Sequence, residues 1–206
     1  MKHSPLLVCI AGPTASGKST ICKALIPQVD GLKLSVSTTT RAPRPGETDG
    51  VDYNFVSTDE FKRRVDDGAF IEHAQFSGNM YGTEWVNVDR AEAEGYDLVF
   101  EIEVQGVQQL KARYGDRLTT VFVFPVSFAE LEKRLRGRAT DSEEQIQQRL
   151  KRAKEEVAIL SDTSFSDYLV INDSLDAAIV RIKAIISAER CRLDRLTPKQ
   201  RKSLGC

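Results

Sequence analysis

The chain has 206 residues, of which 41% are hydrophobic and 29% charged, values typical of one soluble globular domain. Its unpaired cysteine spacing favours idle thiols in a reducing cytoplasm. Its 29 basic and 30 acidic residues nearly cancel, so no overall basic field draws it to nucleic acid or anionic lipid. Four scattered cysteines and two histidines offer no zinc-ligand spacing, and no apolar run approaches the ~20 residues of a membrane helix.

Short apolar runs followed by helical patterns predict an alternation of strands and helices. The run LLVCIA at residues 6–11 is typical of a strand buried on both faces, and a helical spacing follows at 18–25. Further strands and helices are predicted in turn at residues 96–104, 107–114, 118–126, 128–138, 168–171 and about 175–193. This order indicates an α/β fold with a parallel sheet flanked by helices.

Two segments depart from that alternation. Residues 34–95 hold short β-like pieces separated by turn signals such as PRPG and DGV, which predict an inserted lobe of mixed, largely antiparallel structure. Residues 128–160 are highly charged with helical spacing and little apolar mass, which favours a mobile hairpin over a site. The last ten residues, TPKQRKSLGC, are typical of a frayed tail.

The segment GPTASGKS at residues 12–19 satisfies the pattern G-x-x-x-x-G-K-[ST], between a predicted strand and a predicted helix. Backbone N–H groups of such a loop surround an anion, Lys18 would neutralise the β and γ phosphates, and Ser19 would ligate Mg²⁺. The motif predicts a nucleoside triphosphate site. It leaves open whether the phosphoryl group goes to water or to a second substrate.

Arginines elsewhere bear on that choice. Arg41 and Arg44 each lie beside a proline in one loop, while Arg134 and Arg138 are i,i+4 neighbours, with Arg149 on the next helix. Arginines on charged helices are commonly solvated. Phosphoryl transfer between two nucleotides, however, concentrates negative charge that mobile arginines stabilise, and a covering hairpin excludes competing water.

Six segments in order make the chain resemble the guanylate kinase family of P-loop nucleoside monophosphate kinases: GPTASGKST, SVSTTTRAPRPGETDGVDYNFVS, FIEHAQFSGNMYGT, EIEVQGVQQL, RLRGRATDSEEQIQQRL and VIND. The resemblance implies one domain with a P-loop parallel sheet, an inserted mixed-β GMP-binding lobe and a helical lid. The implied bounds are a core at about 4–34, 96–126 and 161–193, a lobe at 35–95, a lid at 127–160 and a tail at 194–206.

The resemblance also implies roles for individual residues. The ATP site would comprise Gly12, Pro13, Thr14, Ala15, Ser16, Gly17, Lys18, Ser19, Thr20 and Asn172. The phosphate of GMP would be held by Arg41, Arg44, Tyr53 and Tyr81. The guanine would be read by Ser37, Glu72 and Thr83, with Glu103 near the base or ribose. Mg²⁺ would lie near Ser19 and Glu101, and catalysis would rest on Lys18, Arg134, Arg138 and Arg149.

Four positions depart from the family's usual residues, one of them Thr14, which replaces a common serine and keeps the hydroxyl. Glu101 and Glu103 stand where the family often has aspartate, and strand alternation predicts that both face one way near the end of their strand. Ala15 stands where the family commonly has glycine. If that position uses a positive φ, alanine is strained there, and we expect a modest local adjustment.

The implied activity is ATP + GMP ⇌ ADP + GDP with Mg²⁺, in purine nucleotide metabolism, with dGMP as an additional acceptor, by a monomer or homodimer. Two alternatives are a catalytically inactive guanylate kinase-like module that binds phosphopeptides and a ribose bisphosphate kinase. Inactive modules usually lose the P-loop lysine or lid arginines, which this chain retains. A sugar kinase would not need Ser37 and Glu72 to read a base.

Overall fold

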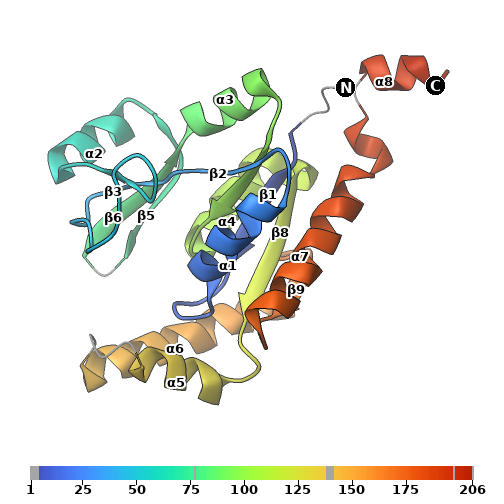
Figure 1. The fold of residues 1–206 in the computed structure, drawn as a ribbon. Coiled ribbons are helices and arrows are strands. Elements are labelled where there is room, and N and C mark those ends of the chain that lie inside the picture. Colours follow the sequence, from blue (N-terminus) through green and yellow to red (C-terminus); the bar gives the residue numbers. More distant parts are fainter. Residues whose placement is uncertain (1–4, 77, 138–141, 197, 206) are drawn as a thin grey trace.

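The computed structural model describes residues 5–76, 78–137, 142–196 and 198–205. Its centre is a parallel sheet with the strand order β2-β7-β1-β8-β9 (Figure 1). These strands are β1 Leu7–Ala11, β2 Leu32–Leu34, β7 Asp97–Glu101, β8 Leu118–Phe124 and β9 Tyr168–Ile171. Every residue of β1 is buried, as its continuous apolar run predicts for a strand covered on both faces.

Helices cover both faces of this sheet. Val8 and Ile10 of β1 pack with α1 (Lys18–Leu25) and α7 (Leu175–Arg190). Leu7, Cys9 and Ala11 point the other way and pack with α3 (Trp85–Glu94) and α4 (Val104–Tyr114). Alternate side chains of one strand therefore supply both halves of the core, which confirms the predicted α/β class.

A second sheet of four strands has the order β4-β3-β6-β5. We call residues 38–84 the lobe; its strands are β3 Thr38–Thr39, β4 Asn54–Phe55, β5 Phe70–Phe76 and β6 Asn79–Glu84. The lobe is mixed, as predicted, because β3 runs parallel to β4 while β6 runs antiparallel to β3 and β5. It lies beside the central sheet in Figure 1.

Two helices in this region were not predicted. In α2 (Thr58–Asp66), Phe61 is the buried residue, so the segment carries little apolar periodicity. Its N-terminus is capped by Ser57, which accepts a hydrogen bond from the Glu60 N–H, and Phe61 stacks on Phe70 at 4.5 Å between ring centroids. In α3, Val88 and Ala91 pack into the core on the face of the central sheet that α4 also covers.

Helices α5 (Phe128–Arg136) and α6 (Glu143–Ala158) form a hairpin below the sheet in Figure 1. The hairpin has an apolar cluster of its own, which includes Leu131, Leu135, Ile146, Leu150 and Ala153. Ser142 and Gln145 form a capping box at the start of α6. The short 3₁₀ helices are Ile26–Gln28, Gly115–Arg117, Ile159–Ser161 and Leu193–Arg195.

Several boundaries differ from the sequence predictions; the strand predicted at 118–126, for example, ends at Phe124. The strand predicted at 96–104 ends at Glu101, and α4 begins at Val104, so Glu103 is the N-cap residue of the helix and does not belong to the strand. Near the C-terminus, α8 (Pro198–Ser203) is helical where a frayed tail was predicted, with proline at its first position. Among the described residues, no helix is long and apolar enough to cross a membrane.

Candidate active site

A cleft lies between the P-loop (residues 12–19), the lobe and α6. It is lined by sixteen of the predicted site residues: Pro13, Thr14, Ala15, Gly17, Lys18, Ser19, Thr20, Ser37, Arg41, Arg44, Tyr53, Glu72, Tyr81, Glu101, Glu103 and Arg149. It lies at the carboxyl end of β1 and β7, where open α/β sheets bind ligands. The tertiary structure therefore brings the two predicted anion sites into one cavity.

The P-loop connects β1 to α1 and wraps around the Lys18 side chain. Lys18 is 7% exposed, its Nζ donates to the carbonyls of Gly12 and Pro13, and it lies 3.4 Å from Glu103 Oε1. Gly17, at the N-cap of α1, has φ of 102°, and a Cβ there would lie 2.3 Å from Asn172 Nδ2. Only glycine suits this turn, which presents the N-terminus of α1 to the cleft.

Ala15 adopts φ of 67°, in the left-handed region that glycine favours. Its methyl group is buried in the apolar cluster of the hairpin, beside residues such as Leu131 and Leu150. The P-loop pattern is retained around it. Because Ala15 has a positive φ, alanine is strained at this position, as predicted for that case. Its methyl group also adds a contact with the hairpin that glycine would lack.

Ser19 and Glu101 place two oxygen ligands side by side. The Ser19 hydroxyl donates to Glu101 Oε1, and burial raises the pKa of Glu101 while this hydrogen bond lowers it in part. Mg²⁺ favours oxygen ligands and usually keeps several waters and substrate phosphates, so one hydroxyl and one carboxylate suffice from the protein. The two side chains fit the predicted magnesium site.

On the lobe side, Arg41 is held by the carboxylate of Glu47. Its Nη1 and Nη2 each donate to one Glu47 oxygen at 2.9 Å, and its guanidinium lies 5.3 Å from the Tyr53 ring centroid. The pKa of Arg41 is raised, first by this hydrogen bond, and that of Glu47 is lowered by it. The Arg44 N–H also donates to Glu47, so one carboxylate fixes the loop that carries both arginines.

Glu72 lies deeper in the cleft and is 5% exposed. Thr83 Oγ1 donates to its Oε1 at 2.7 Å; burial raises the pKa of Glu72, and this bond lowers it in part. A Cβ on Gly106, near the start of α4, would lie 2.5 Å from Glu72 Oε2, so only glycine leaves room for this carboxylate. The arrangement presents a buried acceptor to a ligand that carries N–H donors.

Comparisons with known proteins identify the family. The guanylate kinase family model matches residues 4–189. The chain is 46% identical over 195 residues to the guanylate kinase of Caldanaerobacter subterraneus subsp. tengcongensis. The alignment covers 95% of this chain and 93% of that protein. This chain belongs to the guanylate kinase family.

Two further relatives support the assignment to guanylate kinases. The Geobacter metallireducens guanylate kinase is 40% identical over 207 aligned positions that span all of both chains. The crystal structure of guanylate kinase from Anaplasma phagocytophilum matches with a TM-score of 0.77 at 30% identity, covering 94% of this chain and 90% of that one. The family assignment therefore agrees in sequence and in fold.

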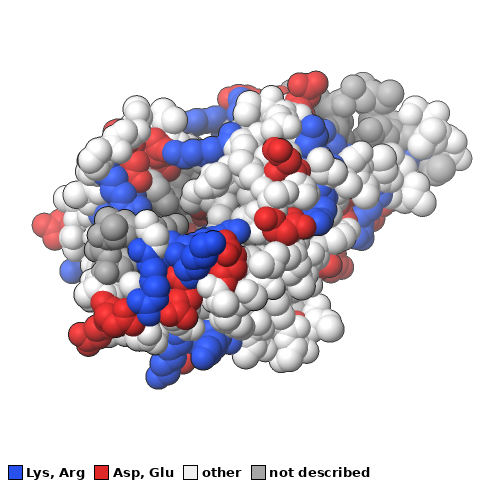
Figure 2. Space-filling view, turned by 60° about the horizontal axis from the view of Figure 1, so that its bottom comes forward, with Lys and Arg blue, Asp and Glu red and all other residues white. Residues whose placement is uncertain are grey.

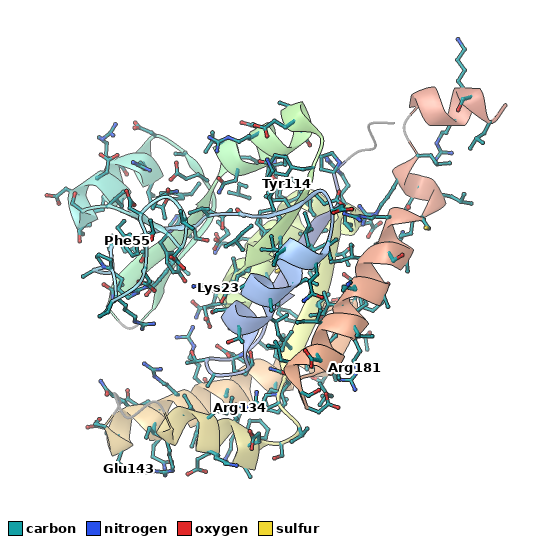
Figure 3. All side chains as sticks on the ribbon, in the orientation of Figure 1. Lys23, Phe55, Tyr114, Arg134, Glu143 and Arg181 are labelled. Carbon is teal, nitrogen blue, oxygen red and sulfur yellow. The ribbon has the colours of Figure 1, made fainter. Side chains whose placement is uncertain are left out.

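Not every predicted residue of this guanylate kinase lines the cleft. Arg134, on α5 (Figure 3), donates from Nη2 to the Asn172 carbonyl at 3.1 Å and from Nη1 to the Ser16 carbonyl at 3.5 Å, so it joins the hairpin to the P-loop. Thr83 acts on the cleft through Glu72. Three further predicted residues do not line the cleft: Gly12, Ser16 and Asn172. The Asn172 side chain donates to the Ser16 carbonyl and so supports the P-loop. Arg138 lies outside the described residues.

Sequence reasoning missed several residues that line the cleft of this guanylate kinase: Ala74, Gly82, Ile102, Gln105, Gly106 and Arg152. Gly106 lies within the quoted segment EIEVQGVQQL, but its closeness to Glu72 depends on the meeting of α4 and the lobe. Arg152 falls three residues after Arg149, one helical turn further along α6. That spacing was the one available signal for it.

Proposed function

We propose that the cleft transfers the γ-phosphoryl group of ATP to GMP, giving ADP and GDP, and that the enzyme works in the cytoplasm. The observation that carries this proposal is the single cavity that joins the P-loop to Arg41, Arg44 and Glu72. A second anion site beside a buried carboxylate suits a nucleotide acceptor, whereas an ATPase needs neither.

In this proposal the P-loop amides and Lys18 hold the ATP phosphates, and Asn172 lies by the adenine end. The acceptor phosphate binds Arg41, Arg44, Tyr53 and Tyr81. Guanidinium forks match phosphate oxygens, and phenol hydroxyls add neutral donors. Glu72, with Ser37 and Thr83, accepts from the N1–H and exocyclic amine of guanine, a pair of donors that adenine lacks. Glu103 lies near the base or ribose.

Catalysis in this proposal rests on position and charge. A GMP phosphate oxygen is already an anionic nucleophile, so no general base is required. Lys18, Arg134, Arg138 and Arg149 offset the charge that spreads over the transferred group. Ser19 and Glu101 would hold Mg²⁺, which supplies further neutralisation of phosphate charge when bound.

A coupled assay of ADP formation tests the proposal. With Mg²⁺ and ATP, turnover should require GMP, with dGMP as a slower acceptor and AMP or UMP far weaker. Equal turnover with GMP, AMP, UMP and no acceptor would sink the idea. Retention of Lys18, Arg134 and Arg149 favours this activity over an inactive phosphopeptide-binding module.

A further inference from the structure

Arg152 is a cleft residue to which the proposed function gives no role. It lies on α6 one turn beyond Arg149, and both side chains line the cleft opposite the lobe. Figure 2 turns the end of the molecule with α5 and α6 forward and shows basic and acidic side chains next to one another there. Most charged residues of α6 are exposed, but Arg152 is half-buried, with 31% of its side chain exposed.

The guanidinium of Arg152 is fixed by a buried carboxylate. Its Nε donates to Glu156 Oε1 at 3.0 Å, and the Glu156 side chain is 8% exposed. An i,i+4 pair on a helix surface is usually exposed at both ends and contributes little to stability. A pair whose acid is buried and whose base lines a cavity does not fit that description.

Glu156 also lies within electrostatic range of the P-loop. Its pKa is raised by burial and then by the negative charge of Glu103, and the positive charge of Lys18 lowers it in part. Glu156 is therefore close enough to Lys18 and Glu103, two lining residues that are 3.4 Å apart, for their charges to act on it.

We propose that Arg152 is a further catalytic residue of the phosphoryl transfer, contacting the phosphates of ATP in the cleft, and that Glu156 is its positioning residue. This inference rests on the proposed function. An arginine presents five N–H donors in a rigid plane, and the bond from Nε to Glu156 sets the orientation of that plane before substrate binds. Such preorganisation reduces the reorganisation needed in the transition state.

The chemical step needs no further reactant. The bond between the γ-phosphorus and the oxygen that bridges to the β-phosphate breaks, and its electron pair stays on ADP. A GMP phosphate oxygen forms the new bond to phosphorus. Arg152 gains or loses no proton; its charge offsets the charge that builds up on the phosphoryl oxygens and on the departing β-phosphate.

The test compares four variants of the full chain: Arg152→Gln, Arg152→Ala, Glu156→Gln and the control Lys151→Gln. Lys151 is the exposed neighbour of Arg152 on α6. We expect Arg152→Gln to lower kcat by about 100- to 1,000-fold, the size typical of a lost transition-state donor, with little change in the KM for GMP and in Tm. Glu156→Gln should lower kcat less, and Lys151→Gln should match the wild type.

Rescue of kcat by added guanidinium ion separates a catalytic role of Arg152 from a purely structural one, because the free ion can replace the lost charge but cannot repair lost packing. The ion should partly restore kcat to Arg152→Ala and leave Lys151→Gln unchanged. If Arg152→Gln keeps the wild-type kcat, or if guanidinium restores nothing to Arg152→Ala, the inference is overturned while the proposed function stands. If the wild type and Lys151→Gln show no turnover that depends on GMP, the proposed function itself fails and the inference falls with it.

Discussion

At the scale of single residues, the cleft carboxylates Glu72 and Glu101 differ from the buried carboxylates Asp97 and Glu189 outside it, which pair with Arg190 and Arg195. Glu72 and Glu101 both have pKa values raised by burial, because ionised carboxylates lose solvation in such surroundings. Neither has an arginine or lysine side chain hydrogen-bonded to it among the described residues. Their ionised forms cost the folded state stability, and we attribute their presence to ligand binding.

Replacing Glu72 with glutamine should therefore stabilise the protein and impair its selectivity. The folded-state pKa of Glu72 lies above its ordinary value of 4.5, so the folded state binds more protons than the unfolded state between those two values. Its contribution to stability falls as pH rises through that window. In urea unfolding, the Glu72→Gln variant should gain stability over the wild type as pH rises from 4.5, and then level off.

The same variant should lose preference for GMP over AMP by a factor on the order of 100, because a neutral amide cannot accept from both guanine donors. Kinetics with both acceptors at pH 7.5 measure this ratio. An unchanged ratio would remove Glu72 from the base site, whatever the stability result.

Arg41 offers a sharper test of the acceptor site. Loss of a charge-assisted contact costs about 1.5 to 3 kcal/mol, so Arg41→Met should raise the KM for GMP by roughly 10- to 100-fold and leave the KM for ATP nearly unchanged. Arg63→Met, on the exposed side of α2, is the matched control because Arg63 also pairs with a glutamate. Equal effects on both substrates would place Arg41 outside the GMP site.

At the scale of elements, the α5–α6 hairpin is a small folding unit beside a large one. Its apolar cluster is separate from the two clusters that cover the central sheet. An ion pair between Arg136 and Glu143 joins its two helices, at a position where both side chains are exposed to solvent. A unit with so small a core opens more readily than the central sheet.

Leu135→Ala tests this separation. Leu135 is 1% exposed, and truncation of a buried leucine costs about 2 to 5 kcal/mol. We expect hydrogen exchange to rise across α5 and α6 while β1 and β8 stay protected, with a fall in kcat. Val180→Ala, at an exposed position on α7, should change neither. A uniform rise across the molecule would show that the hairpin unfolds only with the core.

At the scale of the whole molecule, an ion pair between Lys23 and Asp52 connects the central body to the lobe. Lys23 lies on the side of α1 that faces the lobe (Figure 3), and its Nζ is 2.6 Å from Asp52 Oδ1. Asp52 also accepts from the Thr48 N–H, so its carboxylate is fixed within the loop that leads to Tyr53. Together with the hydrogen bonds between His73 of β5 and Gln109 of α4, the pair holds the lobe beside the central body.

Lys23→Ala should shift the lobe without unfolding either part. Because exposed ion pairs are weak, we expect the KM for GMP to rise only about two- to five-fold, with Tm nearly unchanged. The KM for GMP should also depend less on salt than in the wild type. Lys33→Ala removes another exposed lysine, paired with Glu94 outside the cleft, and serves as control. Identical salt dependence in both variants would contradict the expected role.

Much of the fold was predictable because the signals are local. β1, α1 and β9 match their predicted ranges closely, since continuous apolar runs and helical spacing reflect burial of whole elements. The lobe helix α2 and the following helix α3 were missed because each buries only one or two side chains, which leaves no periodicity to detect. The end of β7 was misplaced because the early start of α4 carries no Ser, Thr, Asn or Asp cap.

The sequence by itself determined the phosphate loop, the parallel sheet and the pair of arginines that calls for a second anion, because each depends on neighbours in the chain. Only the tertiary structure decided which side chains meet. It pairs Arg41 with Glu47, leaves room for Glu72 against Gly106, turns Arg134 toward Asn172 and brings Arg152 into the cleft. Apart from Arg41 and Glu47, these partners are far apart in sequence, so no local pattern records them and packing alone brings them together.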